Sequence, residues 1–128
     1  MDVKIDTKEK FAVITPVGPS IPANMTGKLA ELLLSYFHKP IPHLVLNLKN
    51  VTDLSPEAAE RISDTQEHFL RGRHSFVICC LQQQAISVFE KLGLLDNMAI
   101  TPTESEAWDI IQMEEIEREL MIDPDSDE

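Results

Sequence analysis

The sequence predicts an α/β domain built on a mixed, mostly parallel sheet of four to five strands with about four covering helices. Three observations support this prediction: the chain has 128 residues, 43% of them are hydrophobic, and short apolar runs alternate with stretches of helical periodicity. A single domain commonly takes about 100–200 residues, and strands that alternate with helices are typical of a parallel sheet.

The first strands are predicted as a hairpin. Residues 3–6 alternate apolar and polar side chains, and residues 11–17 form a second, more apolar run. The Lys-Glu-Lys sequence at 8–10 is suited to the turn between them. Residues 18–22, Gly-Pro-Ser-Ile-Pro, interrupt the strand pattern and predict a loop. The hairpin therefore adds an antiparallel edge to the sheet.

A helix and a buried strand follow this loop. Apolar side chains at spacings of three and four predict one helical stripe, which Pro40 and Pro42 end. The stripe consists of Leu29, Leu32, Leu33, Tyr36 and Phe37. Residues 44–48 are apolar without alternation, so we expect a short strand that is buried on both faces.

The start of the second helix is well marked. Serine suits the N-cap, proline the first helical position and an acid the first turn, and Ser55, Pro56 and Glu57 supply them in that order. Gly72 lies just past the predicted end. One face of this helix is expected to be buried, through Ala58, Ile62, Gln66 and Phe69.

The C-terminal third predicts two more strand–helix units. Residues 75–81 resemble a buried strand, and the helix after it is expected to end at Gly93. Residues 98–101 predict a last short strand, and Thr103 with Glu106 forms a capping box that opens a fourth helix. The predicted apolar face of that helix consists of Ala107, Ile110, Ile111, Met113, Ile116 and Leu120.

The net charge of -11 is concentrated at the C-terminal end. Residues 104–128 hold 11 of the 22 acids and one of the 11 bases, Arg118, whereas residues 1–103 are almost neutral. No basic stripe exists, so nucleic-acid binding is disfavoured, and no apolar run is long enough to insert into a membrane. We expect 1–121 to form the domain and 122–128 to be a disordered acidic tail. The acidic segment is either a solvated face or a surface for a basic partner.

The cysteines and histidines show no pattern of a chemical site. Cys79 and Cys80 are adjacent, which excludes a disulfide framework and favours a reducing compartment such as the cytoplasm. On a strand they should point to opposite faces. The four histidines lack metal-ligand spacing, and no nucleotide-binding or hydrolase motif is present. We therefore expect no metal, no cofactor and no enzymatic activity.

Three stretches and their order resemble the STAS domain, the fold of bacterial anti-sigma factor antagonists. Residues 44–51 are similar to the family's central strand and its turn. Residues 77–81 with 85–95 are similar to its strand followed by a helix that ends in Leu-x-x-x-Gly-Leu, and residues 100–107 to its last strand and helix entry. The resemblance covers residues 3–113 and implies a single STAS-like domain.

The family's phosphorylation motif is altered in this chain. It usually reads Asp-Ser-Ser/Thr-Gly, and its first serine accepts the phosphate. Laid from Leu48 without gaps, it falls on residues 55–58, so that Ser55 stands at the Asp position, Pro56 at the acceptor and Ala58 at the glycine. Proline cannot be phosphorylated, and only a shift of one residue makes Ser55 the acceptor. Ser55 is thus a helix cap, a displaced phosphorylation site or a partner contact.

The resemblance implies a regulatory module that binds an anti-sigma factor or kinase-like protein. The expected contacts are the loop at 52–58 with the following helix N-terminus, and the neighbouring loop around an exposed Ile21. The candidate partner-binding residues are Thr52, Asp53, Ser55, Pro56, Glu57, Ser20 and Ile21. The alternative is a constitutive STAS subunit of a transporter, a lipid-trafficking complex or a stress-signalling assembly. A homodimer is compatible with either function.

Overall fold

The computed structural model of the chain describes residues 1–121, so the expected acidic tail at 122–128 lies outside the described residues. Five strands form the main sheet in the order β1-β2-β4-β6-β7. Their bounds are β1 Val3–Thr7, β2 Ala12–Pro16, β4 Leu44–Asn47, β6 Phe76–Cys79 and β7 Ile100–Thr101. β1 pairs antiparallel with β2, and every other neighbouring pair is parallel. The predicted α/β class with a mixed, mostly parallel sheet is confirmed.

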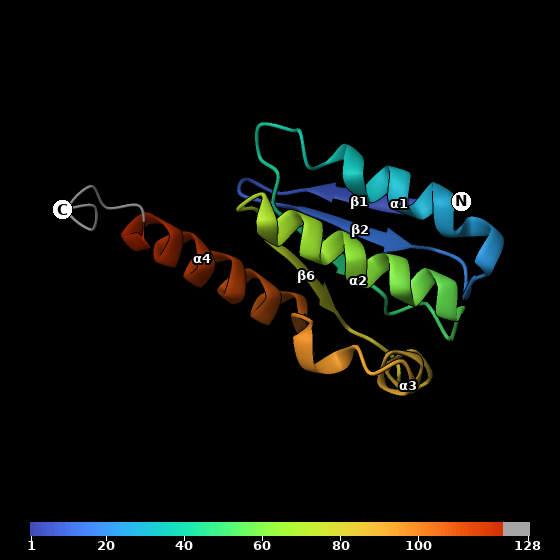
Figure 1. Cartoon of the computed structure of the whole chain (residues 1–128). Coiled ribbons are helices and arrows are strands. Elements are labelled where there is room, and N and C mark those ends of the chain that lie inside the picture. The colour runs from blue at the N-terminus through green and yellow to red at the C-terminus, as the bar shows by residue number, and fades with distance from the viewer. Residues whose placement is uncertain (122–128) are drawn as a thin grey trace.

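Helices cover both faces of this sheet (Figure 1). The bounds are α1 Thr26–Ser35, α2 Pro56–Arg71, α3 Gln83–Lys91 and α4 Glu104–Met121, with short 3-10 turns η1 at Ala23–Met25 and η2 at Leu95–Asn97. The first three helices pack on the face that presents Ile14 and Leu46. α4 packs on the opposite face, which presents Val13 and Val45. The central strands are therefore buried on both sides, as their unbroken apolar sequence predicts.

A second, two-stranded sheet occupies segments that the sequence predicts as loops. β3 is Ser20–Ile21 and β5 is Asp53–Leu54, and the two pair in parallel. Pro19 and Pro22 flank β3, which made this stretch look like a strand breaker. Two-residue strands carry too little periodicity to be recognised in a sequence.

Gly72 lies just past α2 as predicted. The position needs glycine because of a close contact and not because of its backbone conformation. Its φ is -82°, which any residue adopts, and the left-handed conformation falls on Arg73 at φ 65°. A Cβ at position 72 would overlap Cζ of the Phe37 ring. The position therefore requires absence of a side chain. Gly93, with φ +71°, is the left-handed helix cap that the sequence predicts.

The two cysteines do not point to opposite faces, so that expectation is wrong. Cys80 has a φ of 66° and leaves the strand conformation directly after β6. This turn brings its Sγ to 3.1 Å from the Sγ of the buried Cys79. The alternation that holds inside a strand fails at the first residue beyond it.

The predicted single apolar face of α4 is also wrong. Ala107 and Ile111 are fully buried against the sheet, whereas Met113, Ile116 and Leu120 are exposed. At about 100° per residue these two groups lie on opposite sides of the helix. Apolar residues recur at helical spacing along all of α4. Up to Ile111 they lie on the side that faces the sheet, and from Met113 onward they lie on the side that faces solvent.

Candidate partner-binding site

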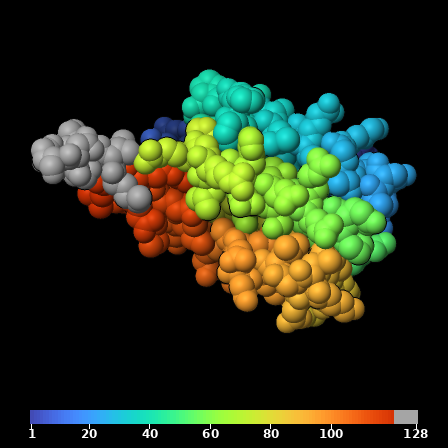
Figure 2. Space-filling view, in the orientation of Figure 1, coloured from blue at the N-terminus to red at the C-terminus, as the bar shows by residue number. Residues whose placement is uncertain are grey.

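The structure brings the two predicted contact loops together. In the β3–β5 pair, Ser20 lies opposite Asp53 and Ile21 opposite Leu54. Backbone N–H groups of Thr52 and Asp53 donate to Pro19 O at 2.9 and 3.0 Å. The surface of residues 48–57 thus adjoins that of 17–22 at one end of the domain (Figure 2).

Ser55 caps α2, as the sequence predicts. Its Oγ accepts the N–H of Ala58 at 3.1 Å, and its carbonyl oxygen accepts the N–H of Ala59 at 3.0 Å. Pro56 occupies the first helical position, where a missing N–H costs nothing. The half-buried Ser55 side chain therefore has a structural role whatever its regulatory one.

The surface around this cap is exposed and acidic. Thr52, Pro56 and Glu57 are exposed, and Asp53 accepts a hydrogen bond from Ser20 Oγ at 3.1 Å. A phosphate on Ser55 would add roughly -1.5 to -2 charges beside the carboxylates of Asp53 and Glu57. Such a change would alter the electrostatic potential of this surface sharply.

Ile21 departs from expectation, because its side chain is fully buried in the main core. The prediction of an exposed apolar contact at this position is wrong. Its carbonyl oxygen instead accepts the N–H of Ser55 at 3.0 Å. The backbone of Ile21 therefore holds the Ser55 backbone in place, whereas the neighbouring Ser20 is exposed.

Two bracing residues of the site escape recognition in the sequence. Asn47, at the carboxyl end of β4, accepts the Lys49 N–H at 2.9 Å and donates to Glu104 at 2.9 Å. Gln82, at the start of α3, donates to Lys49 O at 2.7 Å. A single amide residue within an otherwise apolar strand, as Asn47 is within residues 44–48, is the one signal that could have indicated such a brace.

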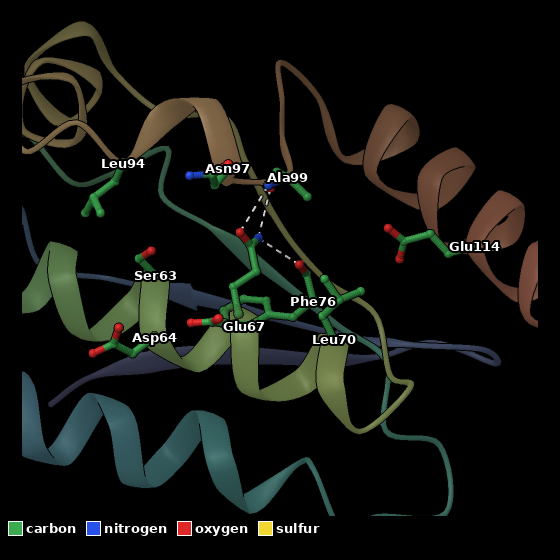
Figure 3. A pocket seen from close by; sticks show the side chains of 10 residues that line it. Ser63, Asp64, Glu67, Leu70, Phe76, Leu94, Asn97, Ala99 and Glu114 are labelled. Atoms are coloured by element: carbon green, nitrogen blue, oxygen red, sulfur yellow. Dashed lines mark hydrogen bonds between the residues drawn. The ribbon is translucent and has the colours of Figure 1, made fainter.

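A cavity of about 540 Å³ lies elsewhere, between α2, η2 and α4 (Figure 3). Its lining includes the acids Asp64, Glu67 and Glu114 beside the apolar Leu70 and Leu94. None of the predicted partner-binding residues lines it. Gln66 also lines the cavity, and its hydrogen bonds to Phe76 and Ala99 are drawn as dashed lines in Figure 3.

The described residues show neither a metal site nor a membrane-spanning helix. Within residues 1–121, no three His, Cys, Asp or Glu side chains are placed to hold a metal ion. No helix in this range combines the length and apolar character needed to cross a bilayer.

The chain belongs to the STAS domain family, because the family model for the STAS domain matches residues 2–107. No curated protein sequence matches this chain. The order of elements and the position of the Ser55 loop after the central strand agree with the resemblance read from the sequence.

Solved structures share the fold at low sequence identity. An anti-sigma factor antagonist from Mycobacterium paratuberculosis has a TM-score of 0.75 at 16% identity, over 87% of this chain and 93% of that one. A Thermotoga maritima protein described as an anti-sigma factor antagonist has a TM-score of 0.75 at 13% identity, over 86% and 94%. The murine anion transporter Slc26a9 has a TM-score of 0.66 at 10% identity, over 81% of this chain and 18% of the transporter.

Proposed function

We propose that the chain is a non-enzymatic regulatory module of the cytoplasm that resembles an anti-sigma factor antagonist. It binds an anti-sigma factor or kinase-like partner through residues 52–58 and the N-terminus of α2. Membership of the STAS family and similarity in fold to anti-sigma factor antagonists support this role.

The observation that carries the proposal is the pairing of β3 with β5. This ladder holds Ser20, Thr52 and Asp53 in an ordered, exposed row beside the capped start of α2. Pro56 and Glu57 extend the row, and all five side chains point away from the core. An exposed segment that is held so firmly is suited to a partner that recognises a fixed shape.

We also propose that phosphorylation is either absent or displaced to Ser55. Pro56, at the position of the family's acceptor serine, has no hydroxyl group. Ser55 Oγ is half-buried at the helix N-terminus, where N–H groups and the helix dipole favour a phosphate.

A constitutive STAS subunit is the second candidate. Pro56 supports it, because a subunit without an acceptor cannot be released by a kinase. The fold that the chain shares with part of the Slc26a9 transporter supports a membrane-associated assembly of this kind.

An affinity pull-down from a lysate of the source cells, with partners identified by mass spectrometry, separates these functions. Wild type is compared with Ser55→Asp and Glu57→Lys. Ser63→Asp is the matched control, because it adds the same charge two turns further along α2 at a half-buried position. Capture of a kinase-like anti-sigma factor that only the site variants weaken supports the first proposal.

Capture of the same permease or assembly subunit by wild type and by Ser55→Asp identifies a constitutive adaptor. A partner that Ser63→Asp weakens as much as Ser55→Asp would place the binding surface elsewhere and contradict both proposals. Phosphopeptide mapping of chain recovered from the cells then tests Ser55 itself. Phosphate on Ser55 contradicts the unregulated version.

A further inference from the structure

The outer side of α4 carries an apolar stripe that nothing in the described chain covers. Met113, Ile116 and Leu120 are 60%, 58% and 68% exposed, and they recur at spacings of three and four on one side of the helix. The side that packs on the sheet, through Ala107 and Ile111, lies about half a turn away. α4 is therefore apolar on two opposite sides.

The stripe lies on the part of α4 that extends past the sheet. Between Glu104 and Leu120, Ile111 is the last fully buried residue of α4. The turns after it run beyond the ends of the strands (Figure 1), and the space-filling view shows them projecting from the domain (Figure 2). About 15 Å of helix thus presents its outer side to solvent.

Polar contacts fix which side of these turns faces outward. Glu115 is bound to His43 Nε2 at 2.7 Å, and Glu114 accepts a hydrogen bond from Ser75 Oγ at 2.5 Å. Arg118 donates to the same Ser75 Oγ at 3.0 Å. Glu114, Glu115 and Arg118 lie on the side opposite to the stripe. A rotation of the helix that buried the stripe would therefore break their contacts with His43 and Ser75.

The exposed side of α4 carries only negative charge. Glu106, Asp109, Glu117 and Glu119 are exposed there beside the apolar stripe. Arg118, the one base of α4, faces the domain with its side chain 18% exposed. Such a surface is complementary to a helix that carries an apolar stripe with basic residues on either side, because the apolar stripes pack together and the opposite charges attract.

The same charges argue against a second copy of this chain as the occupant. Two α4 helices packed along their stripes would bring acidic flanks together in either direction, since no base on that side compensates. We propose that the outer face of α4 at 106–120 is a docking surface for a basic amphipathic helix of another protein, bound in the manner of a helix on an apolar groove or face.

This surface is separate from the proposed Ser55 site. His43 and Ser75 precede β4 and β6, whereas Ser55 lies beyond the carboxyl end of β4. The start of α4 lies at the carboxyl ends of the strands, where Glu104 binds Asn47, but the apolar stripe at 113–120 lies toward their amino ends, beside His43 and Ser75. One domain could therefore hold a partner at Ser55 and another on the stripe at once. The docking surface goes beyond the function proposed above and does not depend on it.

The test uses a fluorescent synthetic peptide of about 18 residues, long enough to form a helix, with leucines on one face and lysines elsewhere. A peptide of equal composition with its leucines dispersed is the control for charge alone. Fluorescence anisotropy at about 0.15 M salt measures both affinities. We expect the amphipathic peptide to bind at least about tenfold tighter than the dispersed one. Backbone NMR shifts on binding should concentrate in residues 106–120.

Two sets of variants assign the binding to the stripe. Combined Met113→Gln, Ile116→Gln and Leu120→Gln should weaken binding about tenfold, as should combined Asp109→Lys and Glu117→Lys. The matched control is Ile5→Gln with Val17→Gln and Ile41→Gln, which removes three exposed apolar side chains elsewhere and should leave affinity unchanged.

Three results would overturn the proposal. Equal affinity for the two peptides would show attraction by charge alone. Unchanged binding by the stripe variant would place the contact elsewhere. Concentration-dependent dimerisation in analytical ultracentrifugation, lost in the stripe variant, would make a second copy the occupant.

Discussion

The side-chain amide of Gln66 pairs with the backbone of Ala99 as a neighbouring strand would. Gln66 Oε1 accepts the Ala99 N–H at 3.0 Å, and Nε2 donates to Ala99 O at 3.0 Å. The same Nε2 also donates to Phe76 O at 2.8 Å. One buried side chain on α2 thus joins β6 to the segment that enters β7.

Replacing Gln66 should destabilise the protein strongly. Gln66→Leu is similar in size but leaves the partly buried Ala99 N–H without a partner, whereas Ala99 O keeps the Ile78 N–H at 3.0 Å. The loss should lower the free energy of unfolding by about 1–3 kcal/mol. Urea unfolding followed by circular dichroism measures this. Gln84→Leu, at an exposed position of α3, is the control and should change stability by less than about 0.5 kcal/mol. Equal losses in the two variants would contradict the role of the amide.

Two glycine-to-alanine substitutions should have opposite effects on stability. Gly72→Ala places a methyl group against Phe37, whose ring is held by His68 and His74, and should cost about 1–3 kcal/mol. Gly27→Ala, in α1 with no heavy atom within 4 Å of the new Cβ, should add about 0.5–1 kcal/mol. Thermal unfolding of both variants checks the signs. A Phe37→Leu change should recover part of the Gly72→Ala loss, and no recovery would assign that loss to another cause.

The cap at Ser55 separates a folding effect from a binding effect. Ser55→Ala removes the acceptor for the Ala58 N–H and should cost about 1 kcal/mol. Ser55→Asp retains an acceptor and should differ from wild type by less than about 0.5 kcal/mol. Chemical denaturation checks both values. A strongly destabilised Ser55→Asp would contradict this account of the cap and would disqualify that variant as a probe of partner release.

Stability should fall as the medium becomes mildly acidic, in part through His74. Burial lowers the pKa of His74 from its ordinary 6.5, and His43, Arg118 and His38 nearby act in the same direction. The folded state therefore binds fewer protons than the unfolded state just below pH 6.5, so stability decreases as pH falls through this value and levels off below the folded pKa.

The His74→Asn variant isolates this contribution. Unfolding midpoints at about pH 7.5 and about pH 5.5 bracket the ordinary histidine pKa. We expect a smaller decrease between these two conditions for the variant than for wild type. His68→Asn, at an exposed position beside the same Phe37 ring, is the control and should behave as wild type. An equal decrease in His74→Asn and wild type would rule His74 out as the source.

Only one of the two adjacent thiols should react in the folded protein. Burial raises the pKa of the Cys79 thiol, so the reactive thiolate is disfavoured there, whereas Cys80 is partly exposed. Labelling with iodoacetamide, followed by peptide mass spectrometry, should modify Cys80 first and Cys79 only after denaturation. Cys80→Ser should abolish the fast reaction. Equal rates at both positions would mean that the end of β6 opens readily.

Strong local signals in the sequence predicted the fold well. Ser55-Pro56-Glu57 marked the start of α2, and Gly93 marked the left-handed turn after α3. Unbroken apolar runs marked the central strands. These features depend on neighbours in the chain. The β3–β5 pair, the Gln66 bridge and the contact of Gly72 with Phe37 join residues far apart in the sequence, and no local pattern marks them.

The candidate site was predicted in part for the same reason. The loop at 52–58 follows from its place after the central strand, and its proximity to Ser20 followed from the resemblance. The burial of Ile21 could not be foreseen, because an isolated isoleucine between prolines does not show which way its side chain points. The outer stripe of α4 was hidden by its spacing, which suits a buried helix equally well.

The β3–β5 ladder has a consequence for the energetics of association. A loop that is mobile before binding loses conformational entropy when a partner orders it, and that loss weakens the complex. Here the backbone of Thr52, Asp53 and Ser55 is already held by bonds to Pro19 and Ile21. A partner that docks on this surface would meet it in its bound shape, so little of the attraction between the two proteins would be spent on ordering the loop.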